Sequence, residues 1–479
     1  MNEPAPNLSP SRGGSRVALV ALLLAATLAL GAAARLAGRD HPAPVRRVAQ
    51  GDVVTLEAGL DRASVLEGSD GLVRVELVLR GREAQDALTP RVPADLVVVL
   101  DRSGSMQGAP IATALGAVRE LIAGLADGDR FALVSYASDA RLDVPLSAAD
   151  AATRASWSRR LDSVQASGGT HLASGLDRAH TVLAEARRQG RAPRVIVLSD
   201  GLANQGDYSL EGLRRRAARA VGGEYVLSSV GIGDGFDETV MSALADAGAG
   251  NFYYLPDLTR LAGVFSDEFA AARETVARGL SVRFAPADGV RLAAAGGYPL
   301  LPESDGSLRF HPGDLFGGQE RRIWLTLHAP TAAAGEVALG GVRVDFAGPD
   351  GARGSASLEA LPELACVADD AAYYASFDAE RYRRATLSES LGQLKQSVAM
   401  KLAEGRQEEA VAELEAYRAA NEAVQRRAFG DVLPEAKAEL DSLHDSVAAP
   451  AAAEPEVRNR LGKTLLESGR DAQRAGAKK

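Results

Sequence analysis

The stretch LVVVLDRSGS at residues 96–105 joins an unbroken apolar run to a loop rich in hydroxyl and carboxylate side chains. A continuous apolar run of this length is typical of a strand buried on both faces of a parallel sheet. Four more short apolar runs follow, at residues 131–135, 195–198, 225–230 and 252–254. The stretches between and after these runs have helical patterns, at residues 111–125, 172–188, 210–221, 238–246 and 258–277. This alternation predicts an α/β fold with an open, doubly wound, mostly parallel sheet and a ligand site at the carboxyl ends of its strands.

Oxygen-bearing side chains gather at that predicted edge. Asp101, Ser103 and Ser105 follow the first strand at positions i, i+2 and i+4 of a glycine-containing loop. Thr170 ends the loop SGGT at residues 167–170, and Asp200 follows a later strand in LSDG at residues 198–201. Two carboxylates and three hydroxyls are hard oxygen ligands, which suit Mg²⁺. We therefore expect a divalent cation site.

The same five residues resemble the metal-ion-dependent adhesion site of the von Willebrand factor type A (VWA) family. The family pattern is Asp-x-Ser-x-Ser on a first loop, Thr on a later loop and Asp in a Ser/Thr-Asp-Gly sequence. Asp101, Ser103, Ser105, Thr170 and Asp200 match this pattern in order. The resemblance covers residues 94–275, and the flanking regions resemble bacterial exported VWA proteins more loosely.

The resemblance implies metal-dependent protein binding rather than catalysis. Ser103, Ser105 and Thr170 would hold Mg²⁺ directly, and Asp101 and Asp200 would act partly through water. Mn²⁺ and Ca²⁺ are alternatives to Mg²⁺. An Asp or Glu of a partner protein would fill the open coordination position. A VWA assembly or chaperone factor of the kind that acts beside AAA+ ATPases is a second hypothesis.

A metallohydrolase is a third and weaker hypothesis. Phosphatases of the haloacid dehalogenase type require Asp where this chain has Ser103. His171 is expected to begin a helix rather than to activate Ser103. The glycines of residues 231–235 lack the last glycine of a dinucleotide fingerprint and predict a strand-to-helix turn. Cys366 is expected to be a packed thiol, because no basic neighbour or helix N-terminus is evident.

Period-2 patterns flank the α/β region on both sides. Val73, Val75, Leu77 and Leu79 alternate with polar residues, as expected of a half-buried strand. Too few strands precede residue 91 to bury a core alone. We therefore predict that residues 51–90 and 279–362 form one β-sandwich, into which a VWA domain at residues 91–278 is inserted.

The remaining chain has a helical pattern. Leucine and valine recur at helical spacing from Leu387 to Leu402, and a similar stripe resumes after Gly405. These features predict a helical region at residues 363–447, built on an antiparallel hairpin. Residues 448–479 are rich in alanine, proline and basic side chains, which favours a solvated, flexible and partly helical tail.

Residues 17–34 form a run of 18 residues without charge, after a lead at residues 1–16. As a helix this run reaches roughly 27 Å, enough for a hydrocarbon core about 30 Å thick with some thinning. We favour an uncleaved transmembrane helix over a cleaved signal peptide, because signal cores are usually shorter. Either outcome places everything after Arg35, including a linker at residues 35–50, outside the cytoplasm, and cleavage would make the chain secreted or periplasmic.

Composition sets further limits. Apolar residues make up 46% and charged residues 24% of the 479 residues, which excludes a mostly disordered chain and a polytopic membrane protein. The net charge of −9 argues against nucleic-acid binding, which usually requires a basic excess. The single cysteine excludes an intramolecular disulfide.

The predicted helix at residues 258–277 runs almost directly into the next strand signal near Ser281. In the VWA family the last helix shifts when a ligand engages the metal. The same helix here could dock in two registers and pull on the sandwich, unless Gly279 absorbs the motion. A static helix in a rigid binder is the alternative.

Overall fold

The structure is a computed structural model that describes residues 46–51, 53–83, 93–186, 191–449, 452 and 454–474. Residues Val45–Lys479 form one compact unit, to which the following description applies. The predicted membrane or signal segment at residues 17–34 lies outside the described residues. Within the described ranges, no helix combines the length and hydropathy needed to cross a bilayer.

A six-stranded sheet has the strand order β10-β9-β8-β5-β6-β7. Its strands pair in parallel, except that β7 is antiparallel to β6 at one edge. The strands are β5 (Ala94–Asp101), β6 (Arg130–Tyr136), β7 (Ala140–Ala148), β8 (Ala192–Ser199), β9 (Val226–Ile232) and β10 (Ala249–Leu255). The predicted doubly wound α/β fold is therefore confirmed. The edge strand β7 was not predicted, because it has only one buried residue and lacks a clear apolar alternation.

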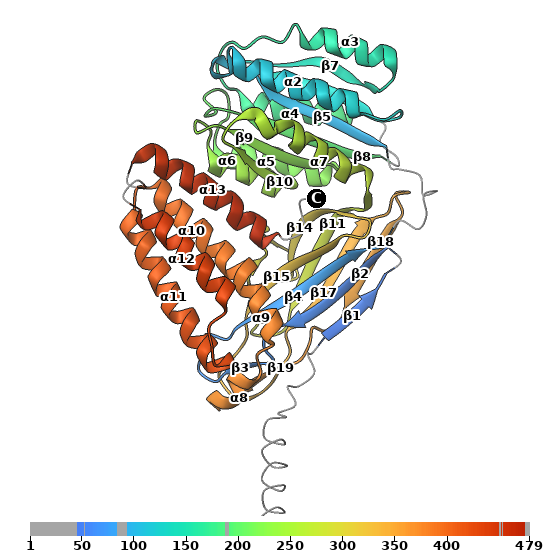
Figure 1. Ribbon diagram of the computed structural model, residues 1–479. Helices are drawn as coiled ribbons and strands as arrows, with labels where there is room; N and C mark the ends of the chain where they lie inside the picture. Colours follow the sequence, from blue (N-terminus) through green and yellow to red (C-terminus); the bar gives the residue numbers. More distant parts are fainter. Residues whose placement is uncertain are drawn as a thin grey trace, which may run out of the picture. The chain divides into compact units, whose positions relative to one another are not determined.

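Helices cover both faces of this sheet (Figure 1). Leu96, Val98 and Leu100 of β5 face one core, whereas Val97 and Val99 face the other, as the period of 2 in a strand requires. The first core is closed by α2 (Ala109–Gly124), α3 (Ala151–Leu161) and α7 (Leu261–Arg273). The second is closed by α4 (Leu172–Ala184), α5 (Leu210–Gly222) and α6 (Glu238–Ala247). Short 3₁₀ turns are η1 (Gly104–Met106) and η2 (Leu258–Arg260).

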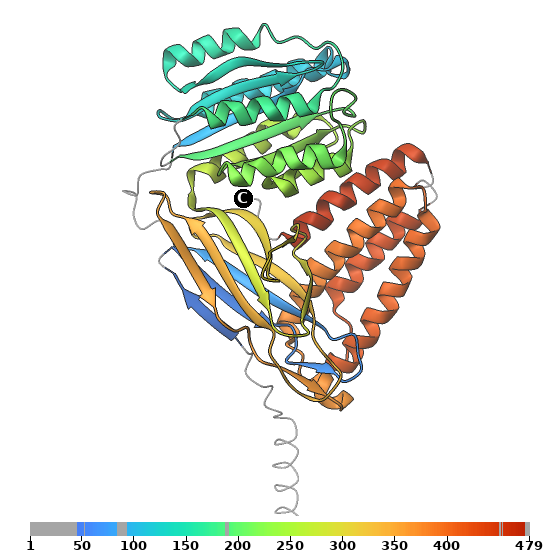
Figure 2. The same cartoon turned by 180° about the vertical axis from the view of Figure 1, so that it is seen from behind.

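Two further five-stranded sheets share one apolar core and form a β-sandwich (Figure 2). The predicted pairing of the early strand with later strands is confirmed, because β4 pairs with β15 and Val75 lies opposite Leu325. One sheet contains β1 (Arg46–Gln50), β2 (Val54–Leu60), β4 (Leu72–Gly81), β15 (Glu320–His328) and β12 (Arg291–Ala295). The other contains β13 (Leu301–Pro302), β14 (Leu308–Phe316), β11 (Thr275–Pro286), β17 (Gly340–Ala347) and β18 (Arg353–Leu358). A small third sheet contains β16 (Gly335–Val337), β19 (Leu364–Val367) and β3 (Ser64–Leu66).

The junction between α7 and β11 is shorter than the sequence predicts. The helix expected over residues 258–277 ends at Arg273, and β11 begins at Thr275, so Glu274 is the only connecting residue. Thr275 and Val276 are β-branched and suit a strand better than a helix end. Gly279 lies inside β11 with a φ of 56°, at an irregularity in the strand pairing.

The region after the sandwich holds more helix than the predicted hairpin. Its helices are α8 (Asp370–Ala375), α9 (Ala379–Ala385), α10 (Leu391–Ala403), α11 (Gln407–Phe429), α12 (Pro434–Ala448) and α13 (Pro455–Gln473), with a π-helical turn η3 (Thr386–Ser390) before α10. Side chains of α10, α11, α12 and α13 share one apolar core, and both views show these helices side by side.

The prediction of a flexible tail over residues 448–479 is wrong for α13. This helix begins at Pro455, a favourable first-turn residue, and its basic side chains meet carboxylates of the α/β domain. Lys463 Nζ lies 2.8 Å from Glu238 Oε2, and Arg470 Nη1 lies 2.9 Å from Asp246 Oδ2. Charges that suggest a solvated surface in the sequence are therefore partly used in tertiary ion pairs.

Candidate functional site

The predicted donors lie at one edge of the six-stranded sheet. Asp101 is the last residue of β5, and Asp200 directly follows β8, the parallel neighbour of β5. Parallel neighbours end at the same edge, so the two loops after these strands meet. Ser105 lies in the turn η1, which follows β5, and Ser103 directly precedes that turn. Thr170 lies two residues before α4.

Asp101 is a buried, rigidly held carboxylate. One oxygen accepts a hydrogen bond from the backbone N–H of Ser103 at 2.8 Å. The other accepts from Ser199 Oγ at 2.9 Å and from Tyr136 Oη at 3.2 Å. Burial raises the pKa of Asp101 above its ordinary value, and the charge of Asp200 acts in the same direction, although the hydrogen bonds from Ser103 and Ser199 oppose the shift. The site therefore has an unbalanced negative charge that a cation would stabilise.

Ser103, Ser105 and Asp200 form a chain of polar contacts between the two loops. Ser103 Oγ lies 3.0 Å from Ser105 Oγ, and Ser105 Oγ donates to Asp200 Oδ1 at 2.8 Å. Burial also raises the pKa of Asp200, whereas the hydrogen bond from Ser105 lowers it. Four of the five predicted residues are thus joined, because Asp101 accepts from the backbone of Ser103.

Thr170 is held next to these residues by its backbone. Its N–H donates to Asn204 Oδ1 at 2.9 Å, and its carbonyl accepts from the N–H of Asn204 at 3.0 Å. The preceding residues contact the first loop, because the N–H of Gly104 donates to the carbonyl of Gly168 at 3.0 Å. The hydroxyl of Thr170 makes no hydrogen bond with the other four residues in the described part of the chain.

The donor set differs from the usual cluster of charged metal ligands. Among the described residues, no three His, Cys, Asp or Glu side chains gather in a way that could hold a metal ion. The site described here instead combines two carboxylates with serine and threonine hydroxyls. Such a set leaves much of the charge of a divalent cation uncompensated, provided that few carboxylates bind it directly.

The residues weighed as catalytic alternatives have other contacts in the structure. His171 Nδ1 is 3.4 Å from the carbonyl of Ser138, and its ring packs on Gly206. Residues 233–237 connect β9 to α6, which confirms the predicted strand-to-helix turn. Cys366 is buried in the core of the sandwich, and burial raises the pKa of its thiol. This thiol is packed, as the sequence predicts.

Comparison with known proteins identifies the domain that carries the site. The sequence model of the von Willebrand factor type A domain family matches residues 95–267. The chain contains a VWA domain. The solved structure of a von Willebrand factor type A protein from Catenulispora acidiphila has a similar fold, with a TM-score of 0.65 at 18% sequence identity. The alignment covers 88% of this chain and 97% of that chain, so the likeness of fold extends beyond the VWA domain.

Two curated bacterial relatives are described as uncharacterized. The Escherichia coli protein YfbK is 26% identical over 221 residues, which cover 45% of this chain and 37% of that protein. The Synechocystis protein sll0103 is 24% identical over 283 residues, which cover 57% of this chain and 66% of that protein. The chain thus spans between about one third and two thirds of the length of these relatives.

Several residues that shape the VWA site were not singled out from the sequence. Tyr136 ends β6, and its hydroxyl also donates to the carbonyl of Leu198 at 2.8 Å. Arg102 is almost fully buried, and its Nη2 lies 2.7 Å from Asp139 Oδ1. Asn204 holds Thr170. Only one feature of the sequence could have pointed to these residues, namely that polar groups at the carboxyl ends of neighbouring parallel strands must converge.

Proposed function

We propose that the VWA domain binds Mg²⁺ through Asp101, Ser103, Ser105, Thr170 and Asp200 and uses the ion to bind a partner protein. The spacing of the donors carries this proposal. In an octahedral Mg²⁺ shell with bonds of about 2.1 Å, neighbouring oxygens lie about 3.0 Å apart. The oxygens of Ser103 and Ser105 are 3.0 Å apart, and those of Ser105 and Asp200 are 2.8 Å apart. Both distances suit neighbouring positions on one ion.

The charge of the site supports a cation. The pKa values of Asp101 and Asp200 are both raised by burial, which means that the folded protein disfavours their ionised forms. A divalent cation would offset that cost by attracting both carboxylates. Mn²⁺ and Ca²⁺ use the same oxygen donors, and Ca²⁺ prefers a larger shell.

We infer that the partner presents an Asp or Glu beside an apolar side chain. A carboxylate would complete the coordination of the ion. The loop after Asp200 carries Leu202 and Tyr208, and Leu210 begins α5; their exposed fractions are 60%, 59% and 43%. Residues 204–206 of this loop pack on residues 169–171, so the apolar side chains belong to the rim of the site. Aromatic and aliphatic residues beside a charged contact are typical of protein interfaces.

The proposed activity is binding or adhesion rather than catalysis. His171, the base weighed for Ser103, contacts the carbonyl of Ser138 and Gly206, and among the described residues no hydrogen bond joins it to Ser103. We further propose that the domain is displayed on the outer side of the cell membrane, on the basis of the apolar run at residues 17–34. Protease accessibility of the VWA domain in intact cells would test that location.

Calorimetric titration of the full chain with Mg²⁺ tests the metal site. Asp200→Ala should weaken Mg²⁺ binding by more than about tenfold, because it removes a carboxylate beside the ion. Asp162→Ala is a matched control, since Asp162 is an exposed VWA carboxylate that pairs with Arg119. Equal affinities of wild type and Asp200→Ala would overturn the proposed site. A partner retained by wild type but lost with chelator and with Asp101→Ala would support metal-dependent binding.

A further inference from the structure

Thr170 is held in a different way from the other four residues of the proposed metal site. Those four are joined to one another by hydrogen bonds, whereas among the described residues the Thr170 hydroxyl makes no hydrogen bond with any of them. The position of Thr170 relative to Ser103 and Ser105 must therefore be set by residues that are not ligands. The turn between β6 and β7, at residues 137–139, makes contacts that can set it.

Arg102 joins the first loop of the site to this turn. Its side chain is only 3% exposed, and its Nη2 donates to Asp139 Oδ1 at 2.7 Å. Its Nε donates to Ser135 Oγ at 3.2 Å, and its backbone N–H donates to the carbonyl of Tyr136 at 2.8 Å. The charge of Asp143 also acts on Arg102. The first loop is thus held to β6 and the turn by both the backbone and the buried side chain of Arg102.

The same turn holds the loop that carries Thr170. Ser138 Oγ accepts a hydrogen bond from the N–H of Gly169 at 3.1 Å. The carbonyl of Ala137 accepts from the N–H of His171 at 2.7 Å. Gly169 and His171 are the neighbours of Thr170 in the sequence. Because both neighbours are bonded to the turn, the turn fixes the backbone that carries the Thr170 hydroxyl.

The two loops also bond directly to each other. The N–H of Ser167 donates to the carbonyl of Arg102 at 2.8 Å, and the N–H of Gly104 donates to the carbonyl of Gly168 at 3.0 Å. Each of the three segments, namely the first loop, the turn and the Thr170 loop, therefore bonds to the other two. Such an arrangement limits how far Thr170 can move away from the first loop.

We propose that the β6–β7 turn, through Ser138 and the contact of Asp139 with Arg102, gives the site a preference for Mg²⁺ over Ca²⁺. This inference rests on the proposed metal site. Mg²⁺ demands near-ideal octahedral geometry, whereas Ca²⁺ has bonds of about 2.4 Å, so that neighbouring oxygens of an octahedral shell lie about 3.4 Å apart. The donor spacings of 3.0 and 2.8 Å at this site suit the smaller ion. A turn that keeps Thr170 from moving outward opposes the larger shell of Ca²⁺.

Calorimetric titration of the full chain with Mg²⁺ and with Ca²⁺ tests the proposal, because it gives the ratio of the two affinities. Ser138→Ala removes an exposed hydroxyl and with it the acceptor for the N–H of Gly169. Asp139→Asn removes the charge that pairs with Arg102. Each substitution should weaken Mg²⁺ binding by about tenfold and Ca²⁺ binding by less than about threefold, since Ca²⁺ accepts a larger and more flexible shell.

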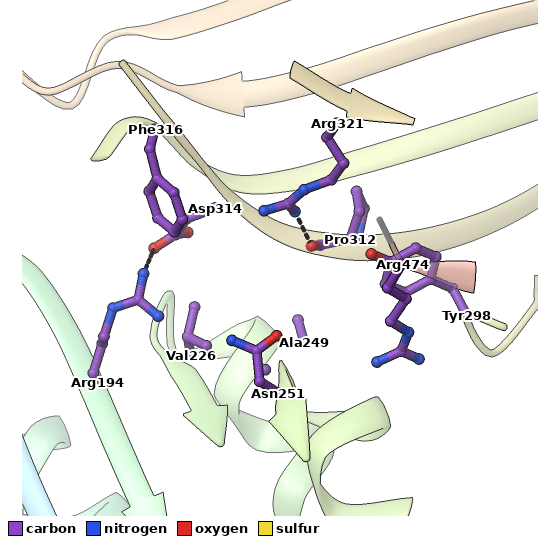
Figure 3. A pocket seen from close by; sticks show the side chains of 11 residues that line it. Arg194, Val226, Ala249, Asn251, Tyr298, Pro312, Asp314, Phe316, Arg321 and Arg474 are labelled. Carbon is purple, nitrogen blue, oxygen red and sulfur yellow. Dashed lines mark hydrogen bonds and ion pairs between the residues drawn. The ribbon is translucent and has the colours of Figure 1, made fainter. Parts of the chain in front are cut away.

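An ion pair near the opposite edge of the same sheet supplies the matched control. Arg194, near the start of β8, pairs with Asp314 of the sandwich at 3.4 Å, as the dashed line in Figure 3 shows. Asp314→Asn removes the charge of an aspartate that pairs with a buried arginine, as Asp139→Asn does. It should leave the ratio of the Mg²⁺ and Ca²⁺ affinities as in wild type, even where thermal unfolding shows a loss of stability.

The outcomes separate this inference from the metal site on which it rests. A lower ratio of Mg²⁺ to Ca²⁺ affinity in Ser138→Ala and Asp139→Asn, but not in Asp314→Asn, would support the proposal. If the ratio stays that of wild type, with both affinities lowered equally or not at all, the turn has only a structural role, and the proposal is overturned while the metal site stands. A wild-type chain that binds no Mg²⁺ would overturn the metal site and this inference with it.

Discussion

At the scale of single residues, the two carboxylates of the proposed metal site are held in different ways. Asp101 has three hydrogen-bond donors and lies inside the sheet edge, whereas the carboxylate of Asp200 accepts from Ser105. The position of Asp200 therefore depends more on the backbone around it. That backbone touches Gly235, since a Cβ at residue 235 would lie only 2.8 Å from the carbonyl oxygen of Asp200.

Gly235→Ala should weaken Mg²⁺ binding without removing any ligand. The added methyl group overlaps the backbone of Asp200, which cannot move aside as a flexible side chain would, and we expect a loss of about tenfold in affinity. Gly201→Ala is the matched control, because its methyl group would meet Ser105 Oγ at an ordinary 3.6 Å. Calorimetry on both variants checks this. An equal effect of the two substitutions would contradict the argument.

The contribution of Glu389 to the stability of the fold depends on pH. It is fully buried in η3, and burial raises the pKa of its carboxyl to about 7, although Arg74, Gln473 and Gln393 oppose the shift. Between the unfolded pKa of about 4.5 and a folded value of about 7, the folded chain binds more protons than the unfolded chain. Stability from this residue is therefore fully present below the unfolded pKa and is lost as the pH rises to about 7.

Glu389→Gln should consequently stabilise the protein most above pH 7. The expected gain is about 3 kcal/mol at pH 8, and it should shrink as the pH falls toward 4.5. Gln393 and Gln473 can rotate their amides to present oxygen to the new amide. Denaturant unfolding of the helical region at pH 5 and pH 8 measures the difference. A gain that is the same at both pH values would contradict the assignment to Glu389.

At the scale of elements, the apolar runs in the sequence predicted the buried strands better than they predicted the edge strand β7 or the end of α7. The buried strands β5 and β8 have only buried residues, which makes their sequence pattern unmistakable. The end of α7 was misplaced because Ala272 and Ala277 both suit a helix, and the change to strand depends on pairing with β14 and β17. Such pairing involves residues distant in the sequence, so a local pattern cannot reveal it.

The buried contacts of α7 favour a static helix over one with two registers. Glu268 lies on this helix and is only 1% exposed, and it accepts hydrogen bonds from four side chains of β8, β9 and β10. Sliding the helix by one turn would break these bonds and leave Arg194 without this partner. Breaking a buried ion pair typically costs about 3–5 kcal/mol.

We therefore expect no change in hydrogen exchange over residues 258–290 when Mg²⁺ and an acidic peptide are added. Glu268→Gln supplies the comparison, because it weakens the anchor and should make the same residues exchange faster in the absence of any ligand. Ligand-induced exchange in wild type would instead support the two-register hypothesis.

At the scale of the whole molecule, the sequence predicted the inserted order of the parts but not the role of α13. The five residues of the proposed metal site could be singled out because each of their three loops carries a short motif, although the loops themselves are distant in the sequence. The attachment of α13 could not, because Arg460, Lys463 and Arg470 acquire their partners only from the folded VWA domain. A segment rich in lysine and arginine has the same sequence whether these side chains are solvated or form ion pairs. Folded geometry decides between these outcomes.

The contacts of α13 reach the proposed metal site through residues 233–238. Lys463 is 3% exposed, and its Nζ donates to the carbonyl of Phe236 at 2.7 Å and to Glu238 at 2.8 Å. It also lies 3.9 Å from the centre of the Phe236 ring. Gly235, next to Phe236, packs on the backbone of Asp200. A helix distant from Asp200 in the sequence thus contacts the segment that packs on this proposed metal ligand.

Lys463→Met should loosen this support while keeping an apolar side chain of similar length. We expect faster hydrogen exchange at residues 233–238 and a several-fold weaker affinity for Mg²⁺, because the carbonyl of Phe236 and the carboxylate of Glu238 lose their buried donor. Lys437→Met is the matched control, since Lys437 is exposed on α12 and pairs with Asp441 within that helix. If Lys463→Met changes exchange at residues 233–238 but leaves Mg²⁺ affinity equal to that of Lys437→Met, α13 is attached to the domain without supporting the metal site.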